Sequence, residues 1–221
     1  MRLGIAATAA LAIGVLLTGC DGGAPAAACR VDVTTPDLVA DREAAGIADC
    51  DPAEWTTRAD GAAAELPDIT LDCLGSEATA ALADVHGPAL INLWSSNCGP
   101  CRDEMPALQA FAEDYGDHVT VLGLNFLDTY PSAAIDFAAR TGVTYPSLAD
   151  ACGDLQQTEL ALNAGLPQFF FVGADGSVTQ RVGGVETEKE VVALVEAELG
   201  LELDAPDAGN AAQDGAKGAD S

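Results

Sequence analysis

The chain has 221 residues, 49% of them hydrophobic, and its 35 acidic residues against 9 basic ones give a formal net charge of −26. That size allows one well-packed domain with flanking segments. The charge argues against binding to nucleic acid or direct attraction to anionic lipid, and favours a solvated acidic surface. Seven cysteines are many for a cytosolic protein of this size, so the composition indicates an oxidising compartment.

The N-terminus has the layout of a bacterial lipoprotein signal. A basic Met1-Arg2 precedes an apolar run, residues 3–17, that is too short to span a bilayer comfortably. Residues 17–20 (Leu-Thr-Gly-Cys) then resemble a lipobox. We therefore expect residues 1–19 to be a signal peptide and Cys20 to carry the lipid, on the extracytoplasmic face of the bacterial cell membrane. An ordinary secretory signal and an uncleaved anchor are the alternatives.

A tether over residues 20–28 should lead to an N-terminal extension over residues 29–65. The extension contains a helical pattern that runs to about Ile47, with Thr35 placed to cap it and Pro36 in its first turn. The residues that follow, from 51 to 66, have the composition of an exposed, loosely structured link.

The main domain is expected over residues 66–200, followed by a disordered tail over residues 201–221. Its strands and helices follow from apolar runs bounded by Gly, Pro and Asp. In chain order they are a strand at 66–71, buried strands at 89–94 and 119–126, a helix at 133–140, a hairpin of 169–172 and 177–182, and a last helix from about 186 to 199.

A pair of cysteines follows the first buried strand, Ala89–Trp94, after the break at residues 95–97. Cys98 and Cys101 bracket Gly-Pro where a helix should begin. The free N–H groups and partial positive charge of a helix N-terminus stabilise a thiolate, which is the reactive form of cysteine. Half a zinc site is the alternative, but no second pair of ligands has suitable spacing. The spacing therefore favours thiol–disulfide exchange.

The segment from Leu93 to Cys101 resembles the active-site signature of the thioredoxin superfamily, with Trp94 beginning the loop. Residues 101–106 (Cys-Arg-Asp-Glu-Met-Pro) are similar to the C-x-x-E-x-P of TlpA/ResA-type membrane-anchored oxidoreductases, which commonly also have Asn at position 92. Asn97 departs from that pattern, because an aromatic residue usually stands there. The resemblance implies a thioredoxin-like α/β fold, with a central mixed sheet flanked by helices and, here, an N-terminal disulfide-pinned helical extension.

The resemblance also assigns roles to individual residues. It implies that Cys98 is the attacking or attacked sulfur, that Cys101 resolves the mixed disulfide, and that Glu104 exchanges a proton with Cys101. An exposed helix carboxylate is the plain alternative for Glu104, and Asp103 is another candidate acid. Trp94 should pack beside the disulfide and contribute to the substrate site.

Pro167 stands at the start of the strand-like run Gln168–Val172, where proline should disrupt pairing. In the superfamily that proline is cis and lies opposite the cysteine pair. The resemblance implies that the backbone of Leu166 pairs with an extended client peptide. A trans proline on an edge strand is the alternative.

The remaining cysteines should form structural disulfides. Lipid and the redox pair account for three of the seven, which leaves Cys29, Cys50, Cys73 and Cys152. Of the three possible pairings, we expect Cys29–Cys50, which closes a short loop around the helical extension, together with Cys73–Cys152. A rival interpretation has Cys73 or Cys152 passing electrons to the active site.

These features predict an extracytoplasmic protein disulfide oxidoreductase that needs no cofactor or metal. The resemblance favours a reductase, with a place in cytochrome c assembly, and implies client proteins with cysteines or disulfides and a membrane thiol–disulfide electron donor or acceptor as partners. An oxidase that forms disulfides in secreted proteins is the main alternative. A redoxin-type peroxidase and a non-catalytic binding lipoprotein, such as a copper carrier, are the others.

Overall fold

The computed structural model describes residues 29–57 and 64–205. The expected signal peptide, Cys20, the tether and most of the expected tail lie outside these residues. The elements are α1 Pro36–Ala44, α2 Pro52–Thr57, β1 Thr70–Cys73, β2 Thr79–Ala81, η1 Leu82–Asp84, β3 Ala89–Trp94, α3 Gly99–Tyr115, β4 Thr120–Phe126, α4 Pro131–Thr141, β5 Ser147–Asp150, η2 Asp154–Gln157, β6 Gln168–Val172, β7 Val178–Val182 and α5 Glu188–Leu199. Within the described ranges no helix is long and apolar enough to span a membrane.

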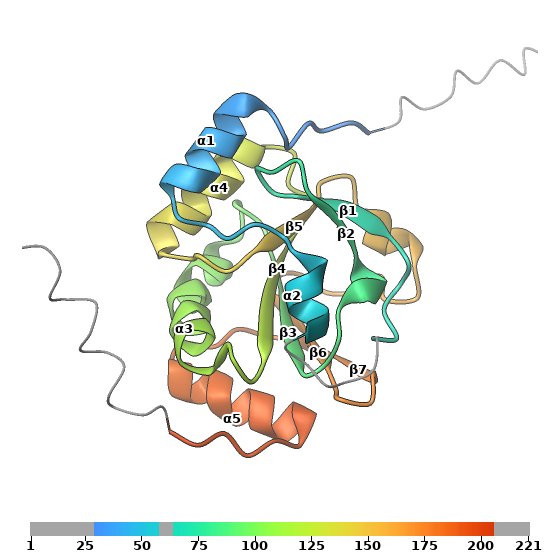
Figure 1. The fold of residues 1–221 in the computed structure, drawn as a ribbon, viewed down its shortest axis with the longest axis vertical. Helices are drawn as coiled ribbons and strands as arrows, with labels where there is room; N and C mark the ends of the chain where they lie inside the picture. The colour runs from blue at the N-terminus through green and yellow to red at the C-terminus, as the bar shows by residue number, and fades with distance from the viewer. Residues whose placement is uncertain (1–28, 58–63, 206–221) are drawn as a thin grey trace, which may run out of the picture.

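The strands form one seven-stranded sheet in the order β2-β1-β5-β4-β3-β6-β7 (Figure 1). The central pairs β3–β4 and β4–β5 are parallel, and the outer pairs are antiparallel. Every residue of β3 and β4 is buried, as expected for strands covered on both faces. The predicted mixed sheet flanked by helices is therefore confirmed.

Alternate residues of β3 point to two separate cores. Leu90 and Trp94 belong to the core that packs against α1, α3, α4 and α5, which we call the α3 face. Ala89, Ile91 and Leu93 belong to the core that contains Trp55 of α2, residues of β1 and β2, and η1, which we call the α2 face.

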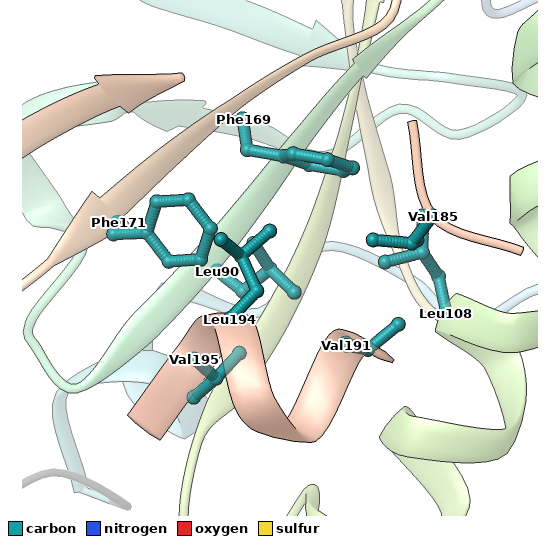
Figure 2. Close-up of a pocket in the computed structure, with 8 residues that line it drawn as sticks. All are labelled: Leu90, Leu108, Phe169, Phe171, Val185, Val191, Leu194 and Val195. Atoms are coloured by element: carbon teal, nitrogen blue, oxygen red, sulfur yellow. The ribbon is translucent and has the colours of Figure 1, made fainter. Parts of the chain in front are cut away.

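The last helix covers one end of the α3 face. Figure 2 shows Val191, Leu194 and Val195 of α5 directed toward Phe169, Phe171 and Leu90 of the sheet. The helix begins with a capping box, in which the Thr187 side chain accepts from the Glu190 amide and the Glu190 side chain accepts from the Thr187 amide. It ends at Gly200 in the left-handed conformation. Both boundaries lie within two residues of those predicted.

The expectation of an exposed, loosely structured link at residues 51–66 is wrong for residues 52–57 and for 64 and 66, and residues 58–63 of that range lie outside the described ones. This region contains α2, and Trp55 at its centre is only 3% exposed. Ala64 and Leu66 are buried in the same core. Burial of a large indole stabilises this segment although its local helix signal is weak, because tertiary packing overrides propensity.

The expected pairing of the structural cysteines is also wrong, because the disulfides are Cys29–Cys152 and Cys50–Cys73. β1 pairs with β5, which brings Cys73 beside Leu148, and Cys50 lies against the same strand with its sulfur 3.5 Å from the Ser147 carbonyl oxygen. The length of the loop between two cysteines, on which the expected pairing was based, contains no information about this long-range strand pairing. The extension is disulfide-pinned as predicted, but each of its cysteines is bonded to the main domain.

Candidate active site

The strand–loop–helix junction between β3 and α3 carries the cysteine pair. Cys98 and Cys101 form a disulfide with a Cα–Cα distance of 5.3 Å. Cys98 is the N-cap of α3, and its sulfur accepts a hydrogen bond from the Cys101 backbone amide at 3.1 Å. A side chain at the N-cap accepts a hydrogen bond from one of the backbone amides of the first helical turn that have no partner within the helix. The same amide would stabilise a Cys98 thiolate more strongly, because hydrogen bonds to charged acceptors are stronger.

The two sulfurs differ in access. Cys98 is half-buried, whereas Cys101 is fully buried beneath the helix start. An incoming thiol or disulfide therefore meets Cys98 first. This asymmetry suits the roles that the resemblance implies, with Cys98 as the attacking and Cys101 as the resolving cysteine.

A buried pair of stacked aromatic rings lies at the junction of β3 and α3. Trp94 is completely buried and stacks on Phe137 with ring centroids 5.6 Å apart. The Arg102 guanidinium lies over the Phe137 ring at 5.2 Å, within cation–π range. Trp94 lies in the same core as Cys101, and because it is completely buried it can contact a client only through the residues that cover it.

Glu104, one turn after Cys101, is buried rather than exposed. Neither carboxylate oxygen has a hydrogen-bond partner of good geometry. Burial raises the pKa of Glu104 to about 8, and the nearby Val185 backbone amide offsets this only in part. The alternative of an exposed helix carboxylate is therefore wrong, whereas Asp103 is exposed.

The predicted proline lies beside this carboxyl. The Leu166–Pro167 bond is cis, and β6 begins at the next residue, where Gln168 pairs with Leu93 of β3. A Cβ placed on Gly184 would lie 3.2 Å from an oxygen of Glu104 and 3.6 Å from Pro167. Pro167 and Glu104 thus both lie close to Gly184, and half-buried Leu166 precedes Pro167 in the chain.

Two buried polar groups near the site were not predicted. Asp128, just beyond β4, accepts hydrogen bonds from the Ser96 amide at 2.6 Å and from the Asn125 side chain at 3.3 Å. It thereby fixes the loop that leads to Cys98. An acidic residue two positions after a buried strand was the available signal, because parallel strands end at the same edge of the sheet.

The second group is Tyr145, which precedes β5. Its hydroxyl oxygen accepts a hydrogen bond from the Asn92 side chain at 3.3 Å, and both residues are buried. Burial raises the pKa of Tyr145; the Asn92 bond acts in the opposite direction, and negative charge on Glu104 raises it further. Asn92, Tyr145 and Glu104 therefore form a buried polar layer behind the cysteine pair.

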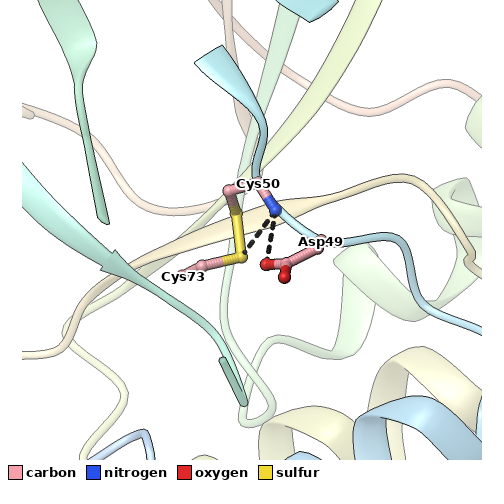
Figure 3. Close-up of side chains that lie close together, drawn as sticks. All are labelled: Asp49, Cys50 and Cys73. Carbon is pink, nitrogen blue, oxygen red and sulfur yellow. Dashed lines mark hydrogen bonds between the residues drawn. A yellow bond between two sulfur atoms is a disulfide. The ribbon is translucent and has the colours of Figure 1, made fainter. Parts of the chain in front are cut away.

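The structural disulfide Cys50–Cys73 differs from this site. Figure 3 shows the Cys50 backbone amide donating to Asp49 Oδ1 and to Cys73 Sγ, at 2.8 and 3.1 Å. These three residues bring potential metal ligands together. Because the two sulfurs are bonded to each other, they do not offer the thiolates that a soft metal requires.

Comparisons with known proteins agree with this arrangement. The thiol:disulfide interchange protein HelX of Rhodobacter capsulatus is 32% identical over 134 residues, 60% of this chain and 73% of HelX. The thiol-disulfide oxidoreductase ResA of Geobacillus kaustophilus is 32% identical over 130 residues, 57% of this chain and 71% of ResA.

Structural similarity supports the fold. A secreted Mycobacterium tuberculosis disulfide oxidoreductase, homologous to E. coli DsbE, superposes with a TM-score of 0.51 at 24% identity, covering 59% of this chain and 96% of that one. The profile of the AhpC/TSA family matches residues 62–181, more than half of the chain. The chain belongs to the AhpC/TSA family, and within it resembles the thiol–disulfide oxidoreductases of the TlpA/ResA type.

Proposed function

We propose that this thiol–disulfide oxidoreductase acts on client proteins outside the cytoplasm through Cys98 and Cys101, held at the membrane by a lipid on Cys20. The observation that carries the proposal is the junction of β3 and α3. There the sulfur of Cys98 accepts a hydrogen bond from an amide at the N-terminus of α3 and is bonded to the buried sulfur of Cys101. The buried carboxyl of Glu104 lies one helical turn after Cys101. These are the requirements for exchange through a mixed disulfide.

In the reducing direction, the Cys98 thiolate attacks a client disulfide. One client sulfur becomes bonded to Cys98, and the other leaves as a thiolate that takes up a proton. The Cys101 thiolate then attacks the Cys98 sulfur and releases the second client sulfur. The client gains two electrons, and the Cys98–Cys101 disulfide is formed again.

Glu104 supplies and accepts the proton of Cys101 in this scheme. With a pKa raised to about 8, the carboxyl is mostly protonated near pH 7 while the pair is oxidised. When a reductant opens the disulfide, the departing Cys101 thiolate can take that proton. In the reverse step the carboxylate removes it again and so activates Cys101 to resolve the mixed disulfide.

The client segment should lie beside Pro167. Leu166 stands two residues before β6, and Pro167 and Glu104 both lie close to Gly184. An extended peptide whose backbone pairs with Leu166 would present its cysteine to Cys98 by strand addition. Leu166 and Pro167 are therefore the proposed binding residues, with Trp94 supporting the site from within.

The direction that we favour is reduction, with cytochrome c assembly as the pathway and a membrane thiol–disulfide protein as the electron donor. The similarity to TlpA/ResA-type proteins supports this direction. Formation of disulfides in secreted proteins is the opposite direction of the same chemistry. Equilibration of Cys98–Cys101 with glutathione separates them, because a low reduction potential suits a reductase and a high one an oxidase.

The test of the exchange activity is insulin reduction by dithiothreitol. The wild-type protein should accelerate it, Cys98→Ser should abolish the acceleration, and Asp103→Asn, which removes an exposed carboxylate from the same helix, should retain it. A wild-type protein that is inactive here, and whose cysteine pair does not react with dithiols, would refute the proposal. Peroxide consumption or tight copper binding by the same protein would favour the peroxidase or the binding lipoprotein.

A further inference from the structure

The three disulfides fall into two classes by access. In Cys98–Cys101 one residue is half-buried and the other buried, and in Cys29–Cys152 one is exposed and the other half-buried. Cys50 and Cys73 are only 3% and 0% exposed. Thiol–disulfide exchange requires that a thiolate reach one of the two sulfurs. By this criterion Cys29–Cys152 resembles the redox pair, not the structural disulfide.

The Cys29–Cys152 disulfide also lies at the same edge of the sheet as the redox pair. β3, β4 and β5 are parallel neighbours, so their C-terminal ends share an edge. Cys98 follows β3, Asp128 follows β4 and Cys152 follows β5. The N-terminal segment shown in blue in Figure 1 is bonded to this edge through Cys29.

A chain of direct contacts joins the two disulfides. Gly153, next to Cys152, packs on Leu127 so closely that a Cβ on Gly153 would lie 2.5 Å from the leucine side chain. The amides of Gly153 and Leu127 both donate to the Asp150 carbonyl oxygen. Asp128, beside Leu127, holds the Ser96 amide at 2.6 Å, two residues before Cys98.

Within this series of contacts, the backbone conformation of Leu127 depends on the residues that surround it. Its φ of +50° makes it the only non-glycine residue with a positive φ among those that the structure describes. Its side chain is 52% exposed, so little burial stabilises the conformation. Such backbone persists only where the surrounding structure enforces it, and here that structure is the turn at residues 150–153.

We propose that Cys29–Cys152 is a second exchangeable disulfide, opened by dithiols in the folded protein, and that its opening loosens the loop that positions Cys98. A dithiol thiolate attacks the sulfur of Cys29, the more exposed residue of the pair, and Cys152 leaves as a thiolate and takes up a proton. The second thiol of the reductant then closes its own disulfide and releases Cys29 as a thiol. Two electrons and two protons pass from the dithiol to the cysteine pair.

The consequence is a redox-dependent active site. With the disulfide closed, residues 150–153 are fixed, and Leu127 and Asp128 hold Ser96 in place. With the disulfide open, the turn after β5 loses its covalent support, and the loop before Cys98 becomes more mobile. The two states of the switch are the closed and open disulfide, so the coupling has a defined physical element.

The first test is a dithiothreitol titration of the full chain under native conditions, quenched with iodoacetamide and mapped by mass spectrometry. Cys29 and Cys152 should become labelled while Cys50 and Cys73 remain unlabelled. Labelling of all four together, only where the fold is lost, would overturn the proposal. This readout needs no client protein, so it is independent of the exchange activity proposed above.

The second test measures coupling to the active site. The rate at which dithiothreitol reduces Cys98–Cys101 should change by about 2- to 30-fold in the Cys29→Ser/Cys152→Ser double variant, a span typical of such couplings. An unchanged rate in a folded variant would overturn the coupling. If the variant does not fold, hydrogen exchange at residues 95–98 of the wild type, before and after selective opening, replaces it. Faster exchange supports the coupling, and equal exchange refutes it.

Discussion

The two faces of the sheet bury different chemistry, although the same strands build both. On the α3 face, Asn92, Trp94, Asn125 and Glu104 each have a buried nitrogen or oxygen atom without a hydrogen-bond partner. Among the residues that the structure describes, the α2 face has one such atom, on Thr120 at the start of β4. The hydrophobic part of the α2 core consists of aliphatic and aromatic side chains together with the Cys50–Cys73 disulfide. Gln168 and Asp150, which strand alternation places on the same face, are also buried, but their side chains have hydrogen-bond partners.

The difference in unpartnered polar atoms between the two faces shows which part of the core lowers the free energy of unfolding. An unpartnered buried polar group costs about 1–3 kcal/mol, so the α3 face carries a penalty that the α2 face largely avoids. The penalty is concentrated behind Cys98 and Cys101, where a carboxyl of raised pKa is useful for proton transfer. We infer that the α2 face mainly supplies stability, and that the α3 face supplies both stability and chemistry.

The largest expected effect is on the pH dependence of stability. Between about pH 4.5 and pH 8, folded Glu104 keeps a proton that the unfolded chain has released, so its contribution is complete below pH 4.5 and is lost as the pH rises to about 8. The loss is about 1.4 kcal/mol per pH unit, roughly 3–5 kcal/mol in all. Glu104→Gln should remove this slope in urea denaturation of the oxidised protein.

Asp103→Asn is the matched control, since it removes an exposed carboxylate one residue away. It should leave the slope of the wild type unchanged. A Glu104→Gln protein with the same pH dependence as the wild type would show that the α3 face carries no titrating group of this kind.

The next effect tests whether the two faces act separately. Ile91→Ala on the α2 face and Leu90→Ala on the α3 face each remove a side chain that is at most 1% exposed. Each should lower the free energy of unfolding by about 2–5 kcal/mol. Neither should alter the pH slope, which urea denaturation at several pH values would show. A changed slope in Ile91→Ala would contradict the separation of the two faces.

A smaller effect is expected from the polar layer itself. Tyr145→Phe leaves the Asn92 side-chain amide without its acceptor, which should cost about 1–3 kcal/mol. Tyr130→Phe is the control, because that side chain is 66% exposed and should change little. Equal stabilities of the two variants would mean that the 3.3 Å contact contributes nothing.

The smallest effect concerns a helix cap on the α3 face. Thr187→Ala removes the capping bond of α5 and should cost about 1 kcal/mol. Thr35→Ala at the N-cap of α1 should cost less, because the Thr35 side chain makes no capping bond. Thermal denaturation of the pair provides the measurement, and a larger loss for Thr35→Ala would reverse the expectation.

The parts of the fold predicted from the sequence are those with strong local signals. The continuous apolar runs of β3 and β4 identified buried strands, and Gly142 and Gly200 marked helix ends that the structure confirms. The spacing of Cys98 and Cys101 indicated their bond without any knowledge of tertiary contacts. Glu104 was identified through a resemblance, and its burial became visible only in the structure.

The parts that were missed depend on residues distant in sequence. The pairing of Cys50 with Cys73 requires β1 to lie beside β5, and no local pattern encodes that. Trp55 is buried because it packs against the apolar side chains of the α2 face, although the sequence around it has the composition of an exposed link. Asp128 and Tyr145 acquire their roles only when the ends of neighbouring strands come together.

The bond between Asp128 and the Ser96 amide has a consequence for how this protein could diversify. Because the carboxylate binds main chain rather than a side chain, the path of the loop does not depend on which residue occupies position 96. Asn97 is exposed and equally free of that constraint. New client preferences could therefore evolve at these two positions by single substitutions, while the sulfur behind them stays in place.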